Sequence, residues 1–153
     1  MEIGFYHCTA SAPADAAVQL AHRAWAAGER LLMVMAEELL DELDLRLWAE
    51  PPDSFLPHGL AREADLAALQ PVLLASAVEP LNGARLLLLL DRPLPDPVAG
   101  FARVFRLFAD GSEGHAMARR EWKALAGRPD VVRRYWQQDA RGRWAEKRRA
   151  ARD

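Results

Sequence analysis

A short stretch late in the chain carries residues of the right type and spacing to bind an anion beside an apolar group. Arg119, Trp122 and Lys123 lie at positions i, i+3 and i+4, so a helix here carries them on one face, with His115 one turn earlier. An aromatic side chain flanked by cations can bind an apolar group and a carboxylate together. The alternative, which composition alone favours, is an amphipathic helix whose Trp122 packs inward and whose cations are solvated.

A second unusual segment, residues 48–58 (WAEPPDSFLPH), is aromatic and apolar where a loop is expected to be polar. Its prominent residues are Trp48, Phe55, Leu56, Pro57 and His58. A loop packed over the edge of a sheet is one interpretation. The other is a contact surface for another protein, because aromatic anchors on a rigid backbone bury a large area at low entropic cost.

Motifs for catalysis, cofactors and metals are missing from the sequence. The connection 8–14 contains no glycine, whereas phosphate-binding loops need glycines so that the backbone can approach the phosphate. His7, His22, His58 and His115 are scattered singly, and Cys8 has no partner at ligand spacing. Adjacent residues of a strand point to opposite faces, so His7 and Cys8 cannot form a base–nucleophile pair. We therefore expect no enzyme activity, cofactor or metal.

Strands and helices alternate along the chain. Apolar runs and period-two patterns predict strands over 2–7, 31–35, 71–75, 85–90 and 102–108. Apolar spacing of 3.6 residues, with glycine or proline at the ends, predicts helices over 15–28, 37–48, 98–101 and 113–125. The fold class is therefore α/β, a single Rossmann-like, doubly wound, mostly parallel sheet of about five strands with helices on both faces.

Charge is distributed unevenly along the chain. From position 119 onward there are twelve bases and five acids, a net charge of +7, whereas the first 118 residues carry eight bases and 17 acids, a net of −9. Residues 137–153 are predicted to be a basic C-terminal tail, partly ordered, following an α/β domain over 1–136. A basic end could contact DNA, but aromatic stacking groups are sparse there, so direct DNA contact is expected to be weak or absent.

The N-terminus MEIGFYHCTA has no basic region before an apolar run, so it predicts neither a signal peptide nor a transit sequence. No apolar run approaches the roughly 20 residues of a membrane-spanning helix. A single cysteine excludes an internal disulfide, which fits a reducing compartment. We expect a cytoplasmic protein that does not contact a membrane.

Several segments together resemble the chi subunit of the bacterial DNA polymerase III holoenzyme. They are FYH at 5–7, LDLRLW at 43–48, PDSFLPHG at 52–59, PVLL at 71–74, NG at 82–83, ARREWKAL at 118–125 and YWQQDARGRW at 135–144. The most specific piece is residues 43–59. The resemblance covers nearly the whole chain and implies a Rossmann-like, non-catalytic accessory subunit in DNA replication.

The resemblance also implies two binding sites. One would contact the psi subunit of the clamp loader through Trp48, Phe55, Leu56, Pro57 and His58. The other would bind the C-terminal tail of single-stranded DNA-binding protein through His115, Arg119, Trp122 and Lys123. The family has a basic residue where this chain has His115, and a histidine is only partly charged near neutral pH. If psi is absent, a DNA helicase is an alternative partner.

Two other hypotheses about the function remain open. A nucleic-acid-binding module would use the basic C-terminus, and an α/β enzyme of unknown type would need a polar pocket with perturbed titrating groups at the strand ends.

Overall fold

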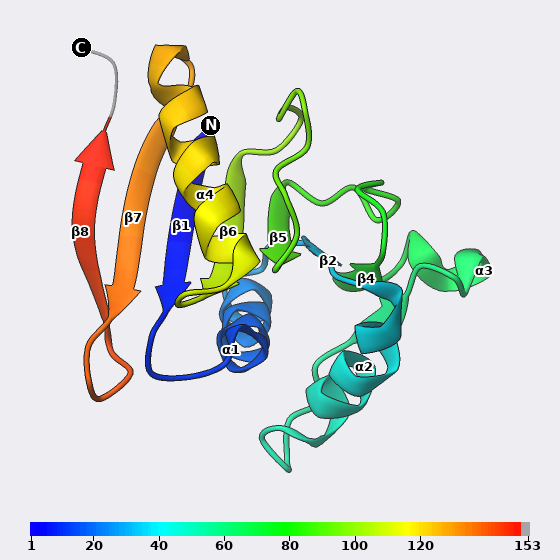
Figure 1. Ribbon diagram of the computed structural model, residues 1–153. Coiled ribbons are helices and arrows are strands. Elements are labelled where there is room, and N and C mark those ends of the chain that lie inside the picture. Colours follow the sequence, from blue (N-terminus) through cyan, green and yellow to red (C-terminus); the bar gives the residue numbers. More distant parts are fainter. Residues whose placement is uncertain (151–153) are drawn as a thin grey trace.

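Eight strands form one sheet, in the order β3-β4-β2-β5-β6-β1-β7-β8, in a computed structural model that describes residues 1–150 apart from the side chain of Ala64 (Figure 1). The strands are β1 (Glu2–Cys8), β2 (Leu31–Val34), β3 (His58–Leu60), β4 (Val72–Ala75), β5 (Leu86–Leu90), β6 (Arg103–Ala109), β7 (Val132–Gln138) and β8 (Trp144–Ala150). Every neighbouring pair is parallel except β7 and β8, which form an antiparallel hairpin at one edge.

Helices cover both faces of this sheet. They are α1 (Pro13–Ala26), η1 (Glu37–Leu39), α2 (Leu40–Ala49), α3 (Ala64–Ala67), α4 (Glu113–Ala124) and η2 (Leu125–Gly127). The side chains of α1 and α2 belong to one buried cluster, and those of α3 and α4 to the cluster on the opposite face. Figure 1 shows α4 passing in front of β1 and β6. None of the described helices is long and apolar enough to cross a membrane.

The central strands form because they are apolar on both sides. Leu31–Val34 and Val72–Ala75 are buried throughout, as expected for parallel strands covered by helices on each face. Burial of these side chains on two faces of one sheet joins the two clusters into a three-layer structure.

The predicted α/β class, the mostly parallel sheet and the helices on both faces are confirmed, but the predicted number of about five strands is wrong. Strand β3 was missed because it has only three residues within a proline-rich segment. Strands β7 and β8 were missed because their largely charged sequences, VRRYWQQ and WAEKRRA, resemble a solvated tail. The Rossmann-like arrangement stays a prediction.

Two further sequence predictions fall in these regions. The short helix expected over 98–101 is wrong, since this segment is irregular and buries Val98 and Phe101 in the cluster below α4. The segment expected to be a basic tail, 137–153, includes the end of β7 and all of β8, and its last residues, 151–153, lie outside the described residues.

Helix α4 is held on the sheet by a cap and a buried ion pair. The Ser112 hydroxyl accepts a hydrogen bond from the His115 backbone N–H, 3.1 Å away, which fixes the first turn. Nε of Arg106 on β6 lies 3.0 Å from Oε1 of Glu121 on α4. These contacts set the position of the face that carries Arg119, Trp122 and Lys123.

Candidate binding sites

A basic cleft of about 390 Å³ lies between α4 and the β7–β8 hairpin. Its lining residues are Arg119, Trp122 and Lys123 from α4, Tyr135 and Gln137 from β7, and Lys147 and Arg148 from β8. Three of the four residues that the sequence placed in one site therefore meet in one cleft.

Aromatic rings form the wall of the basic cleft. Trp122 is largely buried and packs edge to face against Phe5 and Tyr135, with ring centroids 5.4 and 5.8 Å apart. The Arg133 guanidinium lies 4.5 Å from the centroid of the Trp122 ring and donates a hydrogen bond to its carbonyl oxygen. Trp122 is thus fixed in place, while part of it lines the cleft.

Positive charge dominates the basic cleft. Arg119, Lys123, Lys147 and Arg148 are all exposed, and the described lining contains no carboxylate. Within residues 1–150, none of these four cations has an acid within ion-pair distance. The cleft can therefore offer cations to an anionic ligand without first breaking an internal ion pair.

His115, the fourth predicted residue, lies outside the lining of the basic cleft. Its imidazole is nearly buried, and its Nδ1 accepts a hydrogen bond from the Gly111 backbone N–H at 3.0 Å. Burial lowers the pKa of His115, as do the nearby charges of His7 and Arg119, against an opposing effect of Asp110. A neutral imidazole turned toward Gly111 is not a cation for the cleft.

The prediction from the sequence missed Tyr135 and Gln137 and did not place Lys147 and Arg148 in this site. A signal was present, because Arg133, Tyr135 and Gln137 alternate with Arg134 and Trp136 as the two faces of a strand do. Tyr135 packs on the α4 face and Trp136 on the opposite one.

The second predicted site begins at the end of α2. Trp48 and Phe55 are exposed to 53% and 86%, and Leu45, one turn before Trp48, is also exposed. We call Leu45, Trp48 and Phe55 the aromatic surface. Exposed large apolar side chains in one short stretch of chain are a feature of protein-binding surfaces.

The other predicted members of this site, Leu56, Pro57 and His58, are buried or partly buried and pack the loop against the rest of the chain. Leu56 is exposed to only 1%, and Pro57 is partly buried. The buried His58 ring bridges the loop to α2, since Nδ1 lies 2.8 Å from the Leu56 carbonyl oxygen and Nε2 lies 3.1 Å from that of Asp44. The Trp48 ring packs on His58, with centroids 4.3 Å apart. These contacts anchor the end of the loop to α2, while the Phe55 side chain stays exposed.

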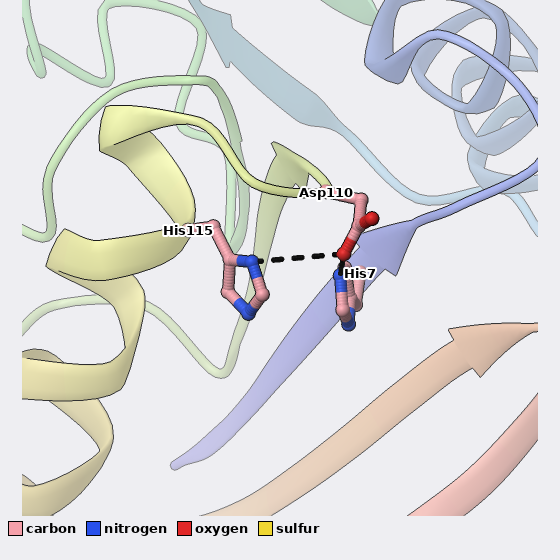
Figure 2. Close-up of side chains that lie close together, drawn as sticks. All are labelled: His7, Asp110 and His115. Carbon is pink, nitrogen blue, oxygen red and sulfur yellow. Dashed lines mark hydrogen bonds and ion pairs between the residues drawn. The ribbon is translucent and has the colours of Figure 1, made fainter.

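A third group of side chains, the histidine cluster of His7, Asp110 and His115, is brought together by the fold (Figure 2). Nε2 of His7 lies 2.7 Å from Oδ1 of Asp110, and Nδ1 of His115 lies 3.8 Å from the same oxygen. His7 is the second-last residue of β1, and Asp110 directly follows the parallel neighbour β6. The register pairs Cys8 with Ala109, so the two side chains lie near the same end of the sheet. No spacing in the sequence indicates this cluster.

Comparison with known proteins identifies the family. Residues 1–129 match the family model described as DNA polymerase III chi subunit, HolC. Over 101 residues, the chain is 37% identical to DNA polymerase III subunit chi of Pseudomonas aeruginosa, which covers 65% of this chain and 69% of that protein. The region matched by the family model includes the aromatic surface and the α4 residues of the basic cleft. The chain therefore belongs to the DNA polymerase III chi subunit family, whose members are accessory subunits of the replicative polymerase.

Proposed function

We propose that this chain is a non-catalytic adaptor in the DNA polymerase III holoenzyme, joining the psi subunit of the clamp loader to single-stranded DNA-binding protein. The observation that carries the proposal is the basic cleft, in which four exposed cations surround an aromatic wall. The ligand we assign to it is the acidic C-terminal peptide of single-stranded DNA-binding protein.

The chemistry of the basic cleft suits an acidic peptide that ends in an aromatic residue. Trp122 and Tyr135 offer ring edges and faces to an aromatic side chain. Arg119 and Lys123 from one side, and Lys147 and Arg148 from the other, can bind the terminal carboxylate and the acids before it. Because the cations are exposed, the attraction should weaken as salt rises.

A peptide titration tests this assignment. A fluorescent peptide ending in Asp-Phe is titrated with the wild type, with Arg119→Ala and with Arg120→Ala, and anisotropy reports binding. Arg120 is the matched control, since it is exposed on the same helix but does not line the cleft. We expect Arg119→Ala to weaken binding about tenfold, the usual effect of removing a charge-assisted hydrogen bond, and Arg120→Ala to change it less than twofold. Equal affinity of the two variants would contradict the assignment.

We assign the aromatic surface to the psi subunit. Its support is the pair of exposed rings, Trp48 near the end of α2 and Phe55 on the following loop, whose end is anchored by the buried Leu56 and the hydrogen-bonded His58. A pre-ordered loop binds with a smaller entropic cost, and aromatic residues are enriched among those that dominate binding energy. A DNA helicase is the alternative occupant of the same surface.

Co-purification tests the second assignment. Partners are recovered from cells of the source organism with three forms of the chain: the wild type, Phe55→Ser and Leu69→Ser. Leu69 is a comparably exposed leucine outside the aromatic surface, so it controls for the loss of an apolar side chain. Recovery of psi by the wild type and Leu69→Ser, but not by Phe55→Ser, is expected. Recovery of a helicase in place of psi would favour the alternative.

Direct DNA binding is a second candidate function, favoured by the exposed Lys147, Arg148 and Arg149 on β8. Truncation before residue 145 would remove most of this strand, so Arg149→Glu is the sharper variant. We expect weak binding to single-stranded DNA that is lost at physiological salt, measured by gel shift. Tight binding that Arg149→Glu abolishes would make DNA a direct ligand.

A further inference from the structure

We propose that the histidine cluster, His7, Asp110 and His115, is a binding site for a divalent transition-metal ion, with Zn²⁺ as the preferred ion. The inference is independent of the adaptor function proposed above. It rests on the positions of three ligand-type side chains that the fold gathers from two strand ends and the start of α4 (Figure 2).

The donor atoms have nearly the spacing that a metal requires. Zn²⁺ bound at 2.0–2.2 Å in a tetrahedral site holds its ligand atoms roughly 3.4 Å apart. Here the two nitrogens and the carboxylate oxygen all lie within 4.8 Å of one another. The distances to Oδ1 of Asp110, 2.7 Å from His7 and 3.8 Å from His115, lie on either side of the ideal value. Shifts of under about 1 Å would therefore close the site.

The ligand types select the class of metal. Two imidazoles and one carboxylate suit Zn²⁺, Co²⁺, Ni²⁺ or Cu²⁺, whereas Mg²⁺ and Ca²⁺ prefer a full set of oxygens. Both imidazoles are nearly buried, and the Asp110 side chain is 62% exposed. An ion could enter from the Asp110 side, where water would complete its coordination.

Neighbouring side chains orient both imidazoles. The Tyr135 hydroxyl lies 3.0 Å from Nδ1 of His7, the ring nitrogen that faces away from Asp110. A metal-bound histidine usually makes a hydrogen bond through its second nitrogen, which fixes its tautomer. Phe108 stacks on both rings, with centroids 5.3 Å from His7 and 5.4 Å from His115. Tyr135 and Phe108 thus fix the orientation of the imidazoles, as the neighbours of metal ligands do in metal sites.

The ring nitrogen of His115 that lies nearer Asp110 is unprotonated, although its lone pair now accepts a hydrogen bond from Gly111. Because Nδ1 accepts the Gly111 N–H, this nitrogen carries no proton, and it is the atom that faces Asp110. A bound ion would replace the hydrogen bond from Gly111. Without an ion, a proton on Nε2 of His7 can form the hydrogen bond to Asp110. The competing hypothesis is therefore a hydrogen-bonded cluster that binds no metal.

Metal titration of the full-length, tag-free chain distinguishes a metal site from a cluster that is held only by a hydrogen bond. Calorimetry with ZnCl₂ measures affinity and stoichiometry, and absorption bands of added Co²⁺ report nitrogen and oxygen ligands. Asp110→Asn and His115→Gln test the site. His22→Gln is the matched control. His22 is not part of the cluster, and its ring nitrogens contact Glu50 and Ser54. Titration with MgCl₂ tests the class of ion.

We expect one Zn²⁺ per chain, affinity lowered at least tenfold in Asp110→Asn and His115→Gln, and no change in His22→Gln. The exposed Asp110 can be replaced without opening the core, so Asp110→Asn decides the matter if His115→Gln fails to fold. The proposal is overturned if the wild type binds no Zn²⁺, or if Asp110→Asn binds it as tightly as the wild type does. Equal binding of Mg²⁺ would also overturn it.

Discussion

The hydroxyl of Tyr135 lies 3.0 Å from Nδ1 of His7, while the ring of the same tyrosine packs 5.8 Å from Trp122 in the basic cleft. One residue of β7 thus belongs to both the wall of the cleft and the surroundings of the histidine cluster. Burial raises the pKa of Tyr135, with Asp110 adding to the effect and Arg119 opposing it, so its hydroxyl stays protonated near neutral pH.

The two roles of Tyr135 can be separated by substitution. Tyr135→Phe keeps the aromatic wall and loses only the contact with His7, so we expect peptide affinity to stay within about twofold. Tyr135→Ala removes the ring and should weaken binding about five- to tenfold, in line with about 1 kcal/mol for an aromatic pair. Fluorescence anisotropy with the Asp-Phe peptide measures both. Equal losses would mean that the hydroxyl, and not the ring, contributes to binding.

Arg148 should make peptide binding sensitive to salt. Its side chain lines the basic cleft, whereas the neighbouring Arg149, also exposed on β8, does not. We expect Arg148→Ala to weaken binding about three- to tenfold at low salt, and the difference to shrink as salt screens the charges. Arg149→Ala is the control of equal charge. A loss of the same size in both variants would indicate a diffuse electrostatic effect with no contribution specific to the cleft.

The Arg106–Glu121 pair should be essential for stability. The Arg106 side chain is fully buried and Glu121 nearly so. Glu121→Ala leaves the guanidinium without its carboxylate, which is expected to lower the free energy of unfolding by about 3–5 kcal/mol. Urea denaturation measures this, with the exposed Glu113→Ala as a control expected to change it by less than about 0.5 kcal/mol. The double variant Arg106→Met/Glu121→Leu removes both charges and should recover most of the loss.

Much of the fold could be predicted because its central elements have strong local patterns. The run 31–34 has only buried apolar side chains, and the apolar spacing of 40–49 gives one buried face, so both elements were recognisable from the sequence. The α4 part of the basic cleft was also predictable, since i, i+3 and i+4 always share a helical face.

The rest depends on which segments pair, which local patterns do not contain. Lys147 and Arg148 line the basic cleft only because β8 pairs with β7 beside β1, with an irregular register at Lys147, and an isolated WAEKRRA segment gives no sign of this. The contact between His7 and Asp110 likewise joins residues 103 positions apart through the register of β1 and β6. Strand order is a tertiary property, so neither site could be completed from the sequence.

Adjacent residues of the loop after α2 should respond in opposite ways to substitution. Phe55 is 86% exposed, so Phe55→Ser should change the free energy of unfolding by less than about 0.5 kcal/mol while it removes binding of psi. Leu56 is buried in the cluster with α1 and α2, so Leu56→Ala should cost about 2–5 kcal/mol. Urea denaturation of both variants, compared with their recovery of psi, separates the two roles. A large loss of stability in Phe55→Ser would mean that this ring packs within the chain, and that the aromatic surface is not free to bind a partner.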